Sequence, residues 1–188
     1  MQQIKYFIEN DCGGRDAIMN MTTTDICNIF LIPLTIDSKV SYCEQFKTIF
    51  PNEIKKANCF VSHAWKYKFL EVFDTLCHHF NNDLSTVVWF DLFTNSQHNT
   101  DAKDFDWWQN VFKEAIGEFN HTVLILQPWN DPVVLTRAWC LYEIYCTIEN
   151  NCKFEVALSF NEQLNFIENA NIESLNKMLA TINVEKSE

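Results

Sequence analysis

Glycine is scarce in this chain, which contains only Gly13, Gly14 and Gly117. Phosphate-binding loops of the P-loop and Rossmann types need several glycines directly after a strand. None of the three glycines lies near a run of residues with the pattern of a strand. ATP hydrolysis and hydride transfer on those two scaffolds are therefore excluded.

The sequence also lacks a basic run and a long apolar segment. Its 14 Lys and Arg residues are scattered among 25 Asp and Glu residues, and the formal net charge is −11. Such a charge disfavours duplex nucleic acid or an anionic membrane as the main partner. No apolar stretch is long enough to span a bilayer, and the N-terminus lacks a signal segment. We therefore expect a soluble, cytoplasmic protein that binds neither nucleic acid nor membranes.

None of the eight cysteines belongs to a C-x-x-C pair. Several lie within apolar runs, which is typical of buried, reduced thiols rather than of a disulfide framework. Cys140, Cys146 and Cys152 are six residues apart, a spacing that does not bring them to one face of a helix. We expect no metal site there.

Strand-like apolar runs alternate with helical patterns along most of the chain. Strands are expected at residues 57–62, 86–90, 121–127 and 154–158, and helices at 66–80, 105–118, 135–150, 161–170 and 172–182. Short, nearly continuous apolar runs are typical of strands buried on both faces of a parallel sheet. The alternation indicates an α/β domain over residues 57–188, with an open sheet and right-handed crossovers. Residues 1–56 have a different pattern and are expected to form a partly helical N-terminal extension packed on the core.

Polar or aromatic residues follow three of the expected strands. In open α/β sheets, ligands bind at the carboxyl ends of strands, where the winding of the chain reverses. The helix of residues 135–150 begins close to the third of these strand ends. The topology therefore predicts a crevice with six lining residues, which are Ser62, His63, Trp65, Asp91, Trp129 and Glu143.

Glu143 is the strongest catalytic candidate in the sequence. It is the only ordinary acid or base between residues 138 and 148, in a segment that is otherwise almost entirely apolar. A carboxylate in such a buried helix needs a partner, a pocket or a shifted pKa. Trp139 lies four residues earlier and therefore on the same helical face. The alternative is a structural acid that pairs with a backbone amide or a basic side chain.

The remaining candidates each allow a structural and a functional interpretation. Ser62 either contacts a ligand or caps the following helix, and His63 is either a ligand donor or a histidine at a strand end. Asp91 is expected to order the loop that follows it rather than to react. Arg137 either binds a phosphate or pairs with an acid. Its candidate partners are Asp131 and Glu114, and the tryptophans that either stack on a ligand or pack in the core are Trp65, Trp107, Trp108 and Trp129.

Five motifs in a fixed order resemble those of a Toll/interleukin-1 receptor (TIR) domain. They are Phe60-Val61-Ser62-His63, Trp89-Phe90-Asp91, Ala115-Ile116, the apolar run 123–126, and Trp139-Cys140-Leu141-Tyr142-Glu143-Ile144. Their order and rough spacing match over residues 57–160. The segments 105–108 and 135–139 are more similar to TIR-like domains that precede tetratricopeptide repeats.

The resemblance implies a flavodoxin-like parallel sheet of about five strands with helices on both faces. It also implies cleavage of NAD at its nicotinamide–ribose bond, in signalling or defence, with Glu143 as the catalytic acid and NAD as a substrate rather than a cofactor. TIR–TIR contacts between copies would complete the active site, and tetratricopeptide repeats would follow in a longer chain. The residues expected to bind NAD are Ser62, His63, Trp65, Asp91, Trp129, Arg137 and Trp139.

The chain departs from the family pattern after the second strand. Residues 94–104 lack the glycine that many members have there, carry Asp101 and Asp104, and precede an aromatic cluster that includes Phe105, Trp107 and Trp108. These departures keep a second hypothesis open, in which the chain is a non-catalytic TIR-like module for protein interaction or self-association. A third hypothesis is the processing of other nucleotides or nucleosides in a similar pocket.

Overall fold

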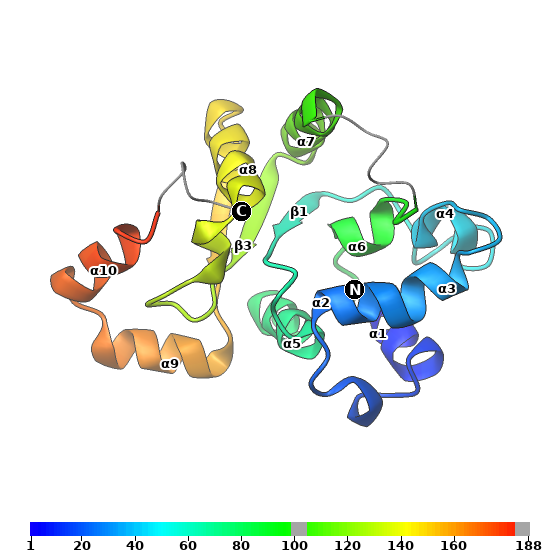
Figure 1. The fold of residues 1–188 in the computed structure, drawn as a ribbon, viewed down its shortest axis with the longest axis horizontal. Coiled ribbons are helices and arrows are strands. Elements are labelled where there is room, and N and C mark those ends of the chain that lie inside the picture. Colours follow the sequence, from blue (N-terminus) through cyan, green and yellow to red (C-terminus); the bar gives the residue numbers. More distant parts are fainter. Residues whose placement is uncertain (99–104, 183–188) are drawn as a thin grey trace.

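The computed structural model describes residues 1–98 and 105–182 of the chain. Its centre is a sheet of four strands, β1 (Cys59–Ser62), β2 (Val88–Trp89), β3 (His121–Ile125) and β4 (Lys153–Ala157), in the order β2-β1-β3-β4. All three pairs are parallel. Each strand falls within one residue of an expected run, so the α/β class and the parallel sheet are confirmed (Figure 1).

The expected count of about five strands is wrong for the part of the chain that the structure describes, which contains four. After β4 the chain forms two helices, α9 (Phe160–Asn169) and α10 (Ile172–Leu179), instead of another strand. Both have the 3.6-residue apolar spacing of amphipathic helices rather than the alternation of a strand. The observed order is compatible with the start of a flavodoxin-like sheet.

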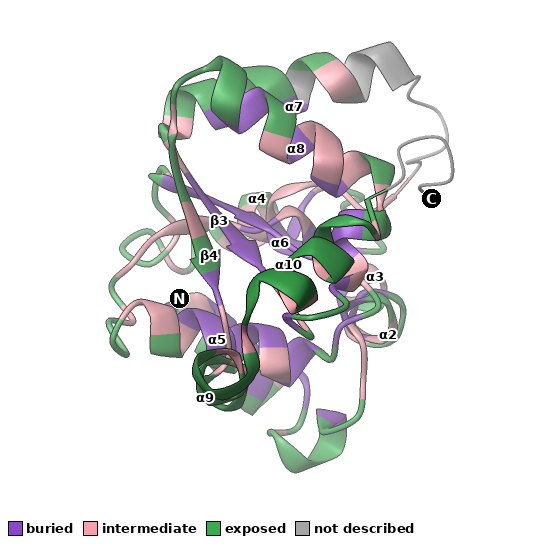
Figure 2. Ribbon diagram, turned by 90° about the vertical axis from the view of Figure 1, so that its left-hand side faces the viewer, coloured by how far each residue is buried: buried purple, intermediate pink, exposed green. Residues whose placement is uncertain are grey.

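Helices cover the sheet on both faces, because successive side chains of β1 point in opposite directions. Phe60 is fully buried with Phe112 and Ile116 of α7 (Phe105–Phe119) and with Cys146 of α8 (Ala138–Glu149). Val61 points to the other face, into the core that includes α5 (Phe69–His79). Figure 2 shows α7 and α8 on one side of the sheet and α5 on the other.

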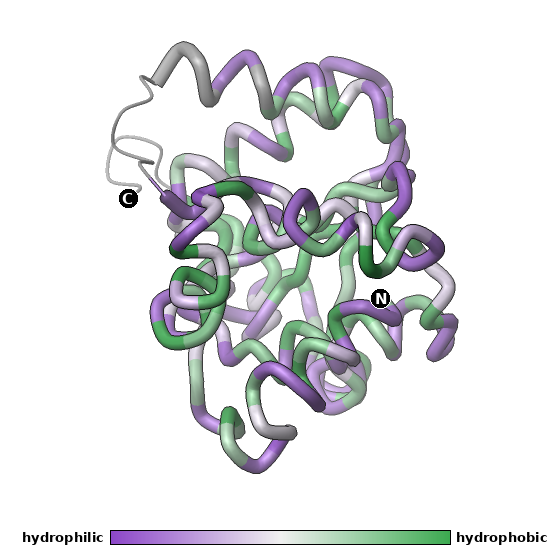
Figure 3. Tube along the Cα trace, turned by 90° about the vertical axis from the view of Figure 1, so that its right-hand side faces the viewer, coloured by the Kyte–Doolittle hydropathy of each residue, from purple (hydrophilic) through white to green (hydrophobic). Residues whose placement is uncertain are grey.

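The N-terminal residues form the expected partly helical extension. Its elements are α1 (Gln2–Tyr6), a π-helical turn (Phe7–Asp11), a 3-10 turn (Asp16–Ile18), α2 (Thr23–Ile26), a second π-helical turn (Cys27–Leu31), α3 (Ile32–Leu34) and α4 (Tyr42–Phe46). Phe7 packs edge-to-face against Phe93 at 5.1 Å and against Phe69 at 6.4 Å. The extension therefore shares one hydrophobic core with the face of the sheet that α5 covers. Figure 3 shows the hydropathy of the chain along its trace, with hydrophobic segments in green.

The winding of the chain reverses at β1. From β1 the chain crosses through α5 to β2 on one side, and then through α6 (Asp91–Thr94) and α7 to β3 on the other side. A 3-10 turn (Val133–Thr136) then leads into α8. The carboxyl end of β1 and the first turns of α8 therefore meet at the position where open α/β sheets bind ligands.

Candidate functional site

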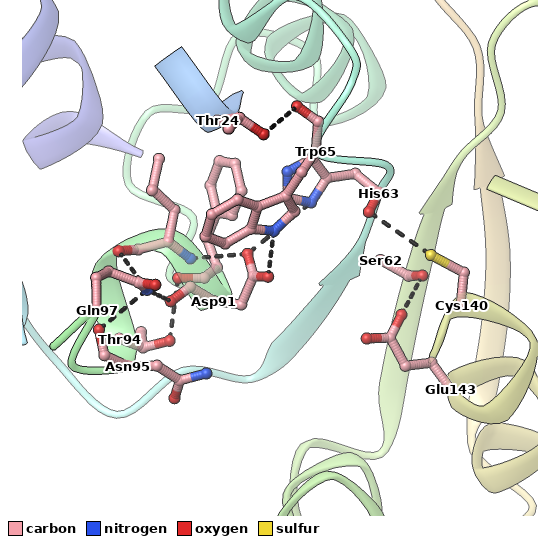
Figure 4. Close-up of polar contacts among 12 residues, drawn as sticks. Thr24, Ser62, His63, Trp65, Asp91, Thr94, Asn95, Gln97, Cys140 and Glu143 are labelled. Atoms are coloured by element: carbon pink, nitrogen blue, oxygen red, sulfur yellow. Dashed lines mark hydrogen bonds and ion pairs between the residues drawn. The ribbon is translucent and has the colours of Figure 1, made fainter. Parts of the chain in front are cut away.

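Ser62 and Glu143 meet at the reversal point, although 81 residues separate them in the sequence. Ser62 is the last residue of β1 and, two residues after Phe60, points toward the same face. Its hydroxyl donates a hydrogen bond to Oε2 of Glu143, which lies in the second turn of α8 (Figure 4). Both residues are buried, with 1% of Ser62 and 8% of Glu143 exposed. The Ser62 hydroxyl group thus connects the Glu143 carboxyl group to β1.

The surroundings of Glu143 favour its protonated form. Burial raises the pKa of Glu143 to about 8, while the hydrogen bond from Ser62 opposes the shift. The charge of Asp91 raises this pKa further, and the charge of Arg137 lowers it. The Glu143 carboxyl group forms no ion pair with any residue that the structure describes. At neutral pH the protonated form of Glu143 is therefore favoured.

Trp65, Asp91 and His63 form a second polar group beside this acid. The indole Nε1–H of Trp65 donates to Oδ2 of Asp91 at 2.6 Å, and Nδ1 of His63 lies 4.0 Å from Oδ1 of the same carboxylate. The imidazole packs edge-to-face on Phe90 at 4.6 Å. Burial lowers the pKa of His63, so the ring is neutral near pH 7. Its buried Nε2 has no hydrogen-bond partner among the described residues.

These groups surround one cavity of about 340 Å³. This volume lies at the lower end of the range for small-molecule sites, which is about 300–1,000 Å³. Both aromatic rings and polar groups line this cavity. The lining residues are His63, Trp65, Asp91, Asn95, Gln97, Phe112, Arg137, Trp139, Cys140 and Glu143.

Arg137 differs from the other arginine of the chain, Arg15. The Arg15 guanidinium pairs with Asp74 at 2.5 Å. Arg137 lines the cavity, half-buried, and pairs with no carboxylate in the described residues. The ion pair considered from the sequence, with Asp131 or Glu114, is therefore not formed. Within the described part of the chain, Arg137 is thus a cation without a carboxylate partner, and it lines the same cavity as the candidate catalytic acid.

The structure brings together most of the residues expected from the sequence. His63, Trp65, Asp91, Arg137, Trp139 and Glu143 all line the cavity. Ser62 does not line it, contrary to the prediction, because its hydroxyl is buried against the Glu143 carboxyl group. Asp91 is the first residue of α6 and accepts a bond from Trp65, so it orders the segment after β2 as expected.

The structure places Trp129 away from the cavity, so its inclusion in the crevice is corrected. Only 2% of Trp129 is exposed, and its ring packs edge-to-face on Phe166 of α9 at 5.2 Å. Its backbone N–H donates to the Glu162 side chain at 2.7 Å. The segment after β3 therefore packs against α9, and the large indole lies against that helix instead of the cavity.

Four lining residues were missed from the sequence. Cys140 lies three residues before Glu143 on α8, so helical spacing could have identified it. Phe112 has the pattern of a core residue, and nothing in the sequence marks Asn95 or Gln97. Gln97 orders its own segment, because its side-chain amide donates to the carbonyls of residues 91, 92 and 95. In the loop 94–104, residues 99–104 lie outside the described residues, as do the side chains of Phe105, Trp107 and Trp108.

A second cavity of about 320 Å³ lies between the N-terminal extension and β2. Its walls are mostly apolar and include Trp89, Phe90 and Phe93, whereas its acids, Glu53 and Glu118, are exposed. Within the part of the chain that the structure describes, no cluster of three or more His, Cys, Asp or Glu residues is suited to a metal ion. No described helix has the length and apolarity needed to cross a membrane.

Comparison with known proteins finds no matching family model, no matching curated protein and no matching solved structure. The function is therefore inferred from the residues and their geometry.

Proposed function

We propose that this protein is a TIR-like NAD glycohydrolase, which cleaves the bond between nicotinamide and ribose with Glu143 as its catalytic residue. The observation that carries this proposal is a buried acid, free of ion pairs with described residues, on the wall of a cavity at the reversal point of the sheet. Acids with strongly shifted pKa values in clefts are often functional. The five ordered motifs that resemble a TIR domain support the same assignment.

The chemistry needs only one acid. Nicotinamide in NAD is already cationic, so it departs as a neutral molecule with the electron pair of the broken C–N bond. Positive charge then develops at C1′ and the ring oxygen of the ribose, and the Glu143 carboxylate stabilises this charge. Water adds its oxygen to C1′, and its proton passes to Glu143 and then to solvent. The products of hydrolysis are nicotinamide, ADP-ribose and one proton.

The substrate itself promotes the active ionisation state. A positive charge brought near a buried carboxyl group favours the charged form and lowers its pKa. Binding of the nicotinamide cation therefore drives the proton from Glu143 before the bond breaks. The Ser62 hydroxyl keeps the carboxylate oriented, since it donates to Oε2.

The first prediction concerns Glu143→Gln, which keeps the shape of the side chain and an acceptor for Ser62 but removes the charge. We expect the rate of nicotinamide release from NAD to fall by about 10²–10³-fold, the usual effect of losing one group that stabilises the transition state. Chromatography with mass spectrometry measures the rate and identifies the products.

Glu149→Gln is the matched control, because this acid lies on the same helix and is exposed. It should cleave NAD at the parent rate. Equal rates for the parent and Glu143→Gln would remove Glu143 from the catalytic role. Cleavage of other nucleosides in preference to NAD would favour the third hypothesis, the processing of other nucleotides or nucleosides.

The alternative of a non-catalytic TIR-like interaction module is favoured by one observation. The amphipathic helix α9 exposes Phe160, Leu164 and Ile167, which lie on one helical stripe. Exposed apolar stripes of this kind mark interaction surfaces. Absence of NAD turnover, together with an unchanged melting temperature in saturating NAD, would favour this alternative.

A further inference from the structure

We propose that Arg137 forms a phosphate subsite at the mouth of the catalytic cavity, so that the substrate must be a phosphorylated nicotinamide nucleoside. This inference deepens the proposed function and rests on it, but the binding of a phosphate by Arg137 can be measured separately from catalysis.

The two arginines of the chain differ in their carboxylate partners. The chain has two arginines, and only Arg15 has a carboxylate partner in the described residues. Arg137 lines a cavity whose other charged residues are Asp91 and Glu143. Asp91 already accepts the Trp65 indole, and Glu143 accepts Ser62. The planar guanidinium is therefore free to bind the oxygens of a phosphate through two parallel hydrogen bonds.

Arg137 also lies at the N-terminal end of a helix. It is the N-cap residue of α8, and no side chain caps this end of the helix. The first intrahelical bond runs from Leu141 N–H to the Arg137 carbonyl oxygen at 3.1 Å, so the helix begins directly after Arg137. The dipole of α8 therefore adds positive potential beside the guanidinium.

The size of the cavity also bears on the substrate. A cavity of about 340 Å³ is at the small end for ligand sites, whereas NAD contains two nucleosides joined by a diphosphate. Part of the dinucleotide must therefore lie outside this cavity. Glu143 is buried and contacts the ribose in the proposed reaction, while Arg137, the N-cap residue of α8, is half-buried. This order places ribose inside and phosphate at the mouth.

The test compares ligands with and without phosphate in the parent and in Arg137→Gln. Calorimetry measures binding of ADP-ribose and of adenosine, and product analysis measures cleavage of NAD and of nicotinamide riboside. Arg137→Gln should weaken ADP-ribose binding by about 10–100-fold, the usual effect of losing hydrogen bonds to a charged group. Adenosine binding should change less than ADP-ribose binding. NAD cleavage should fall more than nicotinamide riboside cleavage, because both reactions lose the effect of the Arg137 charge on the pKa of Glu143, but only NAD also loses a phosphate contact. Arg137→Lys should recover part of the ADP-ribose affinity.

Arg15→Gln is the matched control, since it removes the other arginine at an exposed position outside the cavity. It should bind ADP-ribose like the parent. Melting temperatures of all variants show whether each one is folded.

Four results separate the subsite from the proposed reaction. Loss of phosphate-dependent binding in Arg137→Gln, with or without NAD cleavage by the parent, supports the subsite. If the parent then fails to cleave NAD, the proposed function falls and the subsite stands. If the parent cleaves NAD and Arg137→Gln keeps the same preference for NAD over nicotinamide riboside, the subsite falls alone. Failure of the parent to bind ADP-ribose also overturns the subsite.

Discussion

Glu143 shows how the surroundings of one residue set its chemistry. A glutamate in water has a pKa near 4.5, but burial raises the pKa of Glu143 to about 8. A fully charged carboxylate would be costly at this position because the described residues offer it neither an ion pair nor several hydrogen bonds to offset the loss of hydration. Burial therefore favours the neutral form of this acid, whereas a positive charge beside it favours the charged form.

The second prediction follows from this pKa and concerns stability. Between the unfolded value of 4.5 and the native value of about 8, the native protein binds a proton at Glu143 that the unfolded chain has lost. The free energy of unfolding therefore falls as pH rises through this window. Each unit of pKa difference corresponds to about 1.4 kcal/mol. Glu143→Gln has no proton to lose here, so its stability should fall less than that of the parent between about pH 5 and pH 8.

Thermal unfolding of both proteins across this pH range measures the difference. The contributions of all other titrating groups are common to both and cancel in the comparison. Parallel curves would show that Glu143 titrates like an exposed acid.

At the scale of elements, α8 depends on hydrogen bonds to the sheet as well as on apolar packing. Thr147 is fully buried, and its hydroxyl lies 2.7 Å from the Glu143 carbonyl oxygen and 2.9 Å from the hydroxyl of Thr122 on β3. The hydroxyl donates to that carbonyl and accepts from Thr122. These hydrogen bonds fix the rotation of α8 about its own axis, so that the Glu143 side chain points toward Ser62.

The third prediction tests this link with Thr147→Val, which keeps the shape and removes the hydroxyl. The Thr122 hydroxyl is then buried without its partner, so the free energy of unfolding should fall by about 1–3 kcal/mol. Urea denaturation measures the change. The double variant Thr122→Val/Thr147→Val should recover part of the loss, because no unsatisfied hydroxyl remains. Strict additivity of the two substitutions would argue against a direct bond.

At the scale of the whole molecule, helices cover both faces of the sheet, but β4 is an edge strand with no neighbouring strand on one side among the described residues. The edge strand β4 exposes Phe154 and Val156, and neighbouring α8 exposes Tyr145 and Ile148. An open strand edge with exposed apolar side chains is a common site of association between chains. These exposed residues are candidates for the contacts between copies that the resemblance to TIR domains implies.

The fourth prediction is that catalysis depends on association. If a neighbouring copy completes the active site, the NAD cleavage rate per molecule should rise with protein concentration and fall on dilution. Sedimentation at the same concentrations should show the matching change in mass. A rate per molecule that stays constant over the whole dilution series would show that one copy is sufficient.

The sequence by itself determined the class of fold and the neighbourhood of the site. Apolar runs near 59–62 and 121–125 and the helical spacing of 138–149 are local patterns, and local patterns are enough to predict a strand, a helix and their alternation. The rule that ligands bind at strand ends then predicts a crevice that includes His63, Asp91 and Glu143.

Only the tertiary structure decided which of these side chains meet. Trp129 follows a strand just as His63 does, yet it packs beneath α9, while Asn95 and Gln97 enter the cavity without any pattern in the sequence. The sequence likewise does not reveal that Ser62 contacts Glu143 or that the pKa of Glu143 is raised. Nor does it reveal that Arg137 has no carboxylate partner among the described residues. The physical reason is that burial and pairing depend on distances between residues far apart in the chain, and only the packed fold sets those distances.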